Sequence, residues 1–223
     1  TKKAGRKARS LNEFQCDLME IKRSQMPKPL KHIKDSFVCV VVHRTTSLLF
    51  CEWIKNKKPQ TATPAVIRGV DKLCKEIGIP KKGVYMVSDF GFEFDSERLG
   101  KAGILHKAQK IAHSVEARIG TLRRHLFKQL KLKKGSFKAS LQQTMDILNE
   151  GMRSKVSGKT PLETAQGGKK NILEKFNSKR AKAGSHRPKK IDVGDRVRMS
   201  VRNKKDILYK SNSGIQWDPR TYI

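Results

Sequence analysis

The chain has 223 residues with 50 lysines and arginines against 20 aspartates and glutamates, a formal net charge of +30. Such a charge destabilises a compact protein by self-repulsion unless a polyanion neutralises it, which argues against a small-molecule enzyme and for nucleic acid as partner. Hydrophobic residues make up 36%, and no apolar stretch approaches the roughly 18 residues of a membrane span. We therefore expect no membrane span, and an anionic membrane surface is the alternative polyanion.

Residues 1–12 are predicted to form a basic arm. The arm lacks the apolar segment of a secretory signal, although the absence of acids before Glu13 would also fit the tail of a transit peptide. The cysteines lie in apolar runs and form no Cys-x-x-Cys pair, so we expect buried thiols in a reducing, intracellular setting, not disulfides or zinc ligands. They are Cys16, Cys39, Cys51 and Cys74.

Three apolar segments predict an antiparallel meander. Residues 13–21 form the first strand, and a basic, proline-containing loop over 22–35 leads to the second. Residues 37–43 are a nearly continuous β-branched run, which is typical of a central strand buried on both faces. Residues 48–54 form the third strand.

A helical period follows the meander. Thr63 as N-cap, Pro64 as first helical residue and Gly78 as C-cap predict a helix between them. Further strands are predicted at 83–89 and 103–106.

The second half of the chain is more basic. Apolar residues at helical spacing predict a long helix over 115–134 and another over 137–153. Residues 154–190 are rich in Gly, Lys and Ser and predict a basic linker, and residues 191–223 predict a small β module. The whole order predicts an α/β fold, with residues 13–153 as a ribonuclease-H-like mixed sheet with flanking helices, then the basic linker and a small barrel.

Three carboxylates stand in different local settings. Asp17 lies in an apolar strand, Asp89 at a strand end and Glu116 in the first turn of a basic helix. If they converge, they can hold two divalent metal ions for phosphoryl transfer on nucleic acid. The alternative is a solvent-facing strand residue for Asp17 and, for Glu116, an ordinary first-turn glutamate that interacts favourably with the helix dipole.

This order of elements and acids resembles the integrase catalytic core of retroviruses, retrotransposons and Polinton/Maverick-type elements. Residues 14–18 (FQCDL) fit the family's aromatic-Gln-x-Asp-Leu strand, and residues 89–94 (DFGFEF) keep the Asp, Gly, Glu and Phe of its Asp-Asn-Gly-x-Glu-Phe motif. Residues 115–116 keep the Val-Glu of its Val-Glu-Arg helix start. Residues 158–163 resemble its Gly-x-x-Pro segment, and residues 193–198 the start of its SH3-like C-terminal domain.

The resemblance implies that Asp17, Asp89 and Glu116 are the catalytic positions, which would bind Mg²⁺ or Mn²⁺ in an active enzyme. The chain departs from the family in several places. Phe90 replaces the Asn after the second acid, His43 stands where an Asp ends the second strand, and the segment between the last two acids is shorter. We therefore expect that catalysis is lost and that the chain is a domesticated integrase relative.

His43 and His106 are expected to be core or edge histidines and not metal ligands. The basic face of helix 115–134 is predicted to contact phosphates, and the β module supplies a second basic patch. Aromatic residues are only 6%, too few for a platform that stacks single-stranded bases, so backbone and shape recognition of a folded RNA or duplex is favoured. The predicted nucleic-acid contacts are Arg118, Arg123, Arg124, Lys128, Lys131, Lys133, Lys134, Lys189, Lys190, Arg196, Arg198 and Arg202.

These features predict an integrase-derived nucleic-acid-binding protein that acts as a structural RNA-binding component of a large ribonucleoprotein, such as a mitochondrial ribosome. RNA is favoured over DNA, the other partners would be proteins of the particle, and no cofactor is expected. A mitochondrial or other ribosome-containing compartment is favoured over the nucleus. The alternatives are an active metal-dependent integrase or transposase that performs DNA strand transfer, and a non-enzymatic chromatin or DNA-binding module.

Overall fold

The structure is a computed structural model and describes residues 12–30, 32, 34–109, 113–132, 136–154 and 157–168. Predictions for the basic arm, for most of the linker and for the β module lie outside the described residues. So do seven of the predicted nucleic-acid contacts: Lys133, Lys134, Lys189, Lys190, Arg196, Arg198 and Arg202.

The predicted meander is confirmed. β1 (Glu13–Ile21) pairs antiparallel with β2 (Ser36–His43), which pairs antiparallel with β3 (Leu49–Ile54). Two short 3-10 turns, η1 (Arg23–Gln25) and η2 (Lys28–Leu30), lie in the connection between β1 and β2.

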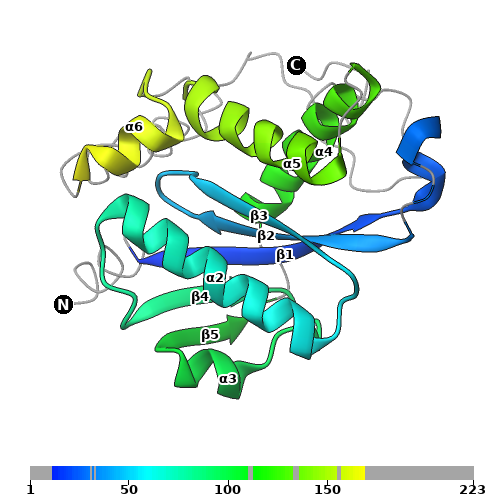
Figure 1. Ribbon diagram of the computed structural model, residues 1–223. Coiled ribbons are helices and arrows are strands. Elements are labelled where there is room, and N and C mark those ends of the chain that lie inside the picture. The colour runs from blue at the N-terminus through cyan, green and yellow to red at the C-terminus, as the bar shows by residue number, and fades with distance from the viewer. Residues whose placement is uncertain are drawn as a thin grey trace, which may run out of the picture. The chain divides into compact units, whose positions relative to one another are not determined.

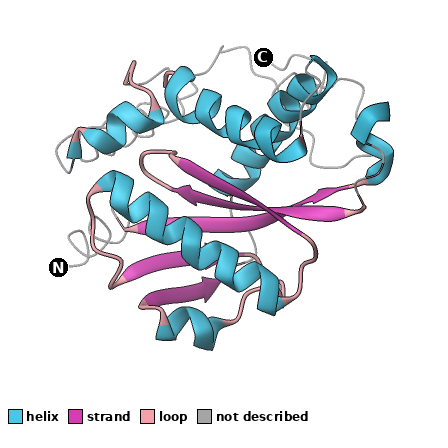
Figure 2. Cartoon of the chain, in the orientation of Figure 1, coloured by secondary structure: helices cyan, strands magenta, loops and turns pink. Residues whose placement is uncertain are grey.

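Two parallel strands complete the sheet. β4 (Val84–Ser88) pairs with the other edge of β1, and β5 (Ile104–Ala108) pairs with β4. The strand order is therefore β3-β2-β1-β4-β5, with β1 in the centre between an antiparallel and a parallel neighbour. This mixed five-stranded sheet with flanking helices (Figures 1 and 2) is the predicted ribonuclease-H-like core.

Helices cover the two faces of the sheet separately. α2 (Pro59–Ile77) lies on one side, and α4 (His113–Leu132) and α5 (Phe137–Asp146) lie on the other (Figure 1). Alternate residues of a strand point to opposite faces. On β1, Phe14 and Cys16 accordingly pack in the cluster that contains α2, and Met19 and Ile21 pack in the cluster that contains α4 and α5.

The predicted start of α2 is wrong by five residues. The helix begins at Pro59 after the N-cap Lys58, so Thr63 and Pro64 lie inside it. The earlier start is favoured because it buries Ala62 and Thr63 completely. Pro59 also suits the first helical position, since its fixed φ is already helical and it lacks an amide that would need a partner. The predicted C-cap is confirmed, since Gly78 has a left-handed backbone with φ of 72°.

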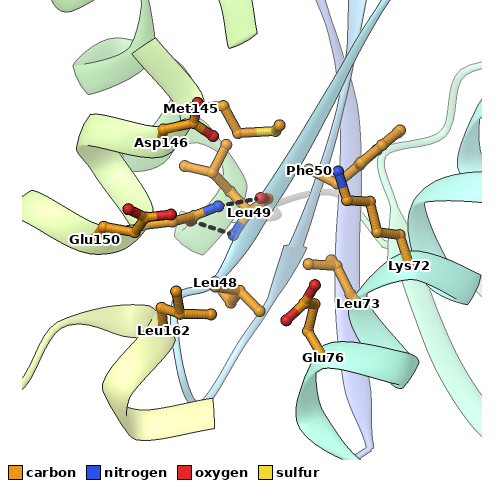
Figure 3. Close-up of a pocket in the computed structure, with 11 residues that line it drawn as sticks. Leu48, Leu49, Phe50, Lys72, Leu73, Glu76, Met145, Asp146, Glu150 and Leu162 are labelled. Carbon is orange, nitrogen blue, oxygen red and sulfur yellow. Dashed lines mark hydrogen bonds between the residues drawn. The ribbon is translucent and has the colours of Figure 1, made fainter. Parts of the chain in front are cut away.

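α5 ends earlier than predicted and changes its geometry. The α-helix stops at Asp146 and continues as one π turn, η3 (Ile147–Gly151). Asn149 in this turn forms hydrogen bonds with the edge strand β3. Its side chain accepts from the Leu49 amide (3.0 Å) and donates to the Leu49 carbonyl (2.8 Å). Figure 3 shows both bonds beside the pocket between α2, β3 and this turn. The side chain of Asn149 thus satisfies the two backbone groups of Leu49 that a neighbouring strand would otherwise pair with.

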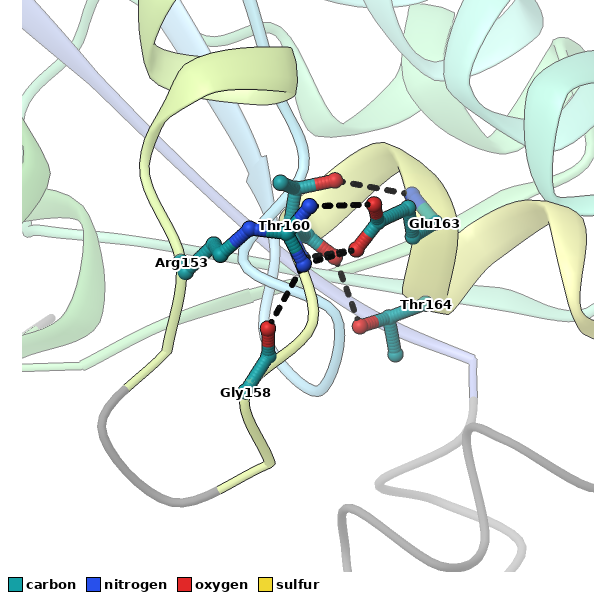
Figure 4. Close-up of polar contacts among 5 residues, drawn as sticks. All are labelled: Arg153, Gly158, Thr160, Glu163 and Thr164. Atoms are coloured by element: carbon teal, nitrogen blue, oxygen red, sulfur yellow. Dashed lines mark hydrogen bonds and ion pairs between the residues drawn. The ribbon is translucent and has the colours of Figure 1, made fainter.

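The folded region continues into the segment predicted as linker. α6 (Pro161–Gln166) starts with a capping box in which Thr160 and Glu163 exchange side-chain-to-backbone hydrogen bonds of 3.1 and 2.8 Å. Arg153 joins them by donating to Glu163 and to the Gly158 carbonyl (Figure 4). The linker prediction fails here because composition cannot show the burial of Ala165, which belongs to the core cluster of α2.

The four cysteines are buried and unpaired, as expected, and burial raises the pKa of each thiol. Among the described helices, none is long and apolar enough to cross a bilayer.

Replacing Asn149 tests the capped edge of β3. Asn149→Ala leaves the amide and carbonyl of the buried Leu49 without these partners, so we expect the free energy of unfolding to fall by about 1–3 kcal/mol in urea denaturation. Lys138→Ala, on the exposed side of α5, is the matched control and should change it by less than about 0.5 kcal/mol. Equal effects of the two substitutions would contradict the assignment.

Candidate acidic cluster and nucleic-acid interface

Asp17 and Asp89 are brought together by the parallel pairing of β1 and β4. The register places Glu13 opposite Tyr85 and Gln15 opposite Val87, and its next step places Asp17 opposite Asp89, just beyond the end of β4. Side chains at paired positions leave a sheet on the same face. Asp17 is half-buried and Asp89 is exposed, and Asp17 shares its face of β1 with Met19 and Ile21, which pack in the cluster that contains α4.

Glu116 approaches the same place from α4. It lies in the first turn of the helix and is exposed. The adjacent Val115 is fully buried, and its backbone amide donates to the side chain of Gln15 at 3.2 Å. Since Gln15 is two residues before Asp17 on the same strand face, this bond fixes the start of α4 beside the two aspartates.

The pKa of Asp17 reports the resulting electrostatic environment. The pKa is raised from 3.8 to about 6, and burial is the largest cause. The charges of Asp89, Glu116 and Glu93 also raise it. The amide of Leu18 opposes the rise by donating to Asp17 Oδ1 at 2.7 Å. Both other predicted acids therefore act on Asp17, and Glu93 is a fourth member of this acidic cluster (Asp17, Asp89, Glu93 and Glu116).

The cluster is not a ready-made metal site. Within the described residues, no three His, Cys, Asp or Glu side chains are grouped so that they could hold one metal ion. Asp17 Oδ1 is engaged by the Leu18 amide, and Asp89 Oδ1 accepts from the Gly91 amide at 3.3 Å. The residues in this conformation do not fit the two-metal arrangement that the resemblance implies, so we derive no step through a metal. Their catalytic role stays a prediction.

The two histidines have hydroxyl partners. His43 is fully buried, with Nδ1 2.9 Å from Thr46 Oγ1. His106 lies between Ser88 and Ser96, at 2.9 and 2.6 Å, and burial lowers its pKa. These positions agree with the prediction of core and edge histidines.

The outer side of α4 carries the predicted basic surface. Apolar residues of the helix, including Leu122, Leu126 and Leu130, face the core. The exposed side chains on its other faces form what we call the basic face of α4, which consists of Arg123, Arg124, Lys128 and Lys131.

Arg118 differs from the other cations of α4. It is half-buried, and its guanidinium donates twice to the Ser47 carbonyl, at 2.6 and 3.2 Å. Burial lowers its pKa. Ser47 has a positive φ of 64°, so Arg118 holds a strained turn between β2 and β3. This contact gives Arg118 a structural role that the helical pattern alone does not reveal.

The raised pKa of Asp17 predicts a pH-dependent cost. The folded state binds the proton of Asp17 more tightly than the unfolded state does, so protonation of Asp17 stabilises the fold. This contribution to the free energy of unfolding is complete below about pH 4 and is lost as the pH rises through about 6. Asp17→Asn should therefore increase the free energy of unfolding at pH 7.5 by about 1–2 kcal/mol, after allowance for solvent screening of a half-buried group, and by nothing at pH 4.

Urea denaturation from pH 4 to 7.5 measures this difference. The neutral exchange Thr121→Ala on α4 is the control and should leave the shape of the pH profile as in the wild type. Parallel profiles for Asp17→Asn and the wild type would contradict the charge interaction.

Comparison with known proteins places the fold. No protein-family model and no curated protein matches the sequence. Among solved structures, the HTLV-2 integrase catalytic core domain in complex with magnesium aligns with a TM-score of 0.52 at 18% identity over 68% of this chain and 93% of that one. The catalytic core of BIV integrase gives 0.51 at 17% over 76% and 99%, and the simian T-cell lymphotropic virus intasome in complex with the PP2A subunit B56 gamma gives 0.57 at 14% over 93% and 66%. The core of this chain has the fold of the retroviral integrase catalytic domain.

Proposed function

We propose that this chain is an integrase-derived nucleic-acid-binding protein in which the basic face of α4 contacts phosphates. The observation that carries the proposal is the arrangement of charge on one helix. Arg124, Lys128 and Lys131 follow one another at i, i+4 and i+7, so they share one side of α4. All three are exposed, in a chain whose net charge is +30. A row of exposed cations of this kind is suited to the electrostatic, sequence-independent contacts that proteins make with a phosphate backbone.

We further propose that the protein is a structural RNA-binding component of a large ribonucleoprotein, such as a mitochondrial ribosome. One feature supports this narrower function. The positive charge is far larger than one enzyme active site needs, and it extends through the sequence beyond α4.

The salt dependence of binding tests the phosphate contacts. Each lost contact to a DNA duplex lowers the slope of log K against log salt by about 0.9. Arg124→Ala combined with Lys128→Ala should therefore weaken binding to all duplexes alike and reduce the slope by about 1.8. Fluorescence anisotropy over a salt series with DNA and RNA duplexes measures both effects.

Lys75→Ala combined with Lys82→Ala is the matched control, since both side chains are exposed and lie outside α4. The control removes the same charge and should leave the slope nearly unchanged. If both double variants reduce the slope equally, binding follows net charge and the interface is not on α4.

A second candidate is metal-dependent DNA strand transfer. It is favoured by the acidic cluster itself, because desolvation and three neighbouring acids make the ionised Asp17 carboxylate costly. A carboxylate held at such a cost is explained if a cation neutralises it during function. Asp17, Asp89 and Glu116 would then provide the ligands after their side chains reorient.

Purification of the native assembly separates the two candidates. The associated nucleic acid is sequenced with and without nuclease treatment and after a moderate-salt wash. Ribosomal RNA with ribosomal proteins is the outcome we expect. DNA from the ends of a mobile element, together with several copies of this chain, would instead support strand transfer and contradict the structural role.

A further inference from the structure

The loop after β4 presents two phenylalanines to solvent. Phe90 is 66% exposed and Phe92 is 95% exposed. Every other phenylalanine that the structure describes is buried or half-buried. An exposed pair of large apolar side chains within three residues is unfavourable in water, and such patches commonly mark binding sites.

The loop is anchored at both ends. At its start, Ser88 Oγ donates to the carbonyl of Asp89 at 2.8 Å, and Asp89 Oδ1 accepts from the Gly91 amide. At its end, the amide of Asp95 donates to the Thr63 hydroxyl in α2 at 3.0 Å. Anchors on both sides reduce the entropy lost when a loop residue binds a ligand.

Side chains inside the loop tighten it further. Phe94 is 6% exposed and packs in the core, with its ring edge-on to His106 at 6.4 Å. Glu93 folds over Gly91 so closely that a Cβ at position 91 would collide with the Glu93 carboxylate. Glu93 is also 3.8 Å from Lys57. The turn therefore buries the ring of Phe94 and leaves the rings of Phe90 and Phe92 exposed.

The surroundings restrict what the two rings can bind. The loop contains Asp89 and Glu93, which belong to the acidic cluster and influence the same Asp17 as Glu116 at the start of α4. These carboxylates repel phosphates, so a nucleic-acid backbone is favoured along the basic face of α4 and disfavoured at the loop. A nucleobase is uncharged and flat, and it can stack on a phenyl ring beside carboxylates.

We propose that Phe90 and Phe92 form a stacking site for unpaired bases of a nucleic acid whose phosphates lie along α4. The bases are unpaired because both faces of a base inside a duplex are already covered by its neighbours. The site thus binds a single-stranded end, bulge or loop next to a helical segment. This inference rests on the proposed nucleic-acid binding. It adds base contacts by two phenylalanines, whereas the low overall aromatic content argued against an extended stacking platform.

Fluorescence anisotropy with two probes tests the stacking site. One probe is a blunt duplex, and the other is the same duplex with a single-stranded overhang. Wild type should bind the overhang probe more tightly. Phe90→Ala combined with Phe92→Ala should lose about tenfold or more of the overhang affinity, with unchanged affinity for the blunt duplex and an unchanged salt slope.

Two further variants make the test specific. Phe92→Leu keeps an apolar side chain without an aromatic face and should also lose overhang affinity. Leu105→Ala on β5, where the leucine is 54% exposed, removes another exposed apolar side chain and should change nothing. Retention of full overhang affinity by the double alanine variant, or by Phe92→Leu, overturns stacking while phosphate binding stands. Failure of the wild type to bind either probe overturns the proposed function together with the site.

Discussion

The parallel pairing of β1 with β4 is the constraint on which the site depends. β1 is the central strand and has an antiparallel partner on one edge and a parallel partner on the other. Ligand sites in open α/β sheets tend to form where the strand order reverses, and in the order β3-β2-β1-β4-β5 this point lies between β1 and β4. Here Asp89 follows the end of β4 and its charge acts on Asp17, while the amide of Asp95 at the end of the next loop donates to the Thr63 hydroxyl in α2.

α4 carries an electrostatic contrast along its length. Glu116 in the first turn of the helix and Lys131 in its last turn each match the sign that the helix dipole favours. Lys131 lies fifteen positions after Glu116, which corresponds to a helix rise of about 22 Å. One rigid element therefore runs from an acidic end, which repels phosphates, to a basic side, which attracts them.

Local sequence signals predicted much of this arrangement. The β-branched run of β2 and the glycine at position 78 are decided by neighbours in the chain, and both predictions hold. The start of α2 could not be decided locally, because Pro59 and Pro64 are both acceptable first-turn residues and only burial against the sheet distinguishes them. α6 was missed for a related reason, since its stability comes from Ala165 in a core formed by distant residues.

In the site, too, some features could be predicted from the sequence and others depend on contacts between distant residues. Strand order brings Asp17 and Asp89 together, and the bond between Val115 and Gln15 brings Glu116 near them. A family pattern captures this order of elements. Glu93 was known as a motif residue, but its influence on Asp17 arises from the fold of the loop over Gly91. Arg118 looked like one more cation on a basic helix, yet its partner is a carbonyl 71 residues away in sequence. Contacts of this kind leave no periodic trace in the chain.

The two candidate functions make opposite demands on the acidic cluster. A purely structural RNA-binding protein gains nothing from an ionised Asp17, whose pKa of about 6 means that the charge is costly at neutral pH. In a metal-dependent enzyme, a bound cation would offset that cost. The proposed stacking site gives the acidic cluster a role in a protein that binds nucleic acid without catalysis. Carboxylates that keep phosphates off the loop leave its phenyl rings accessible to bases, so the cluster contributes to selectivity even where it does not catalyse.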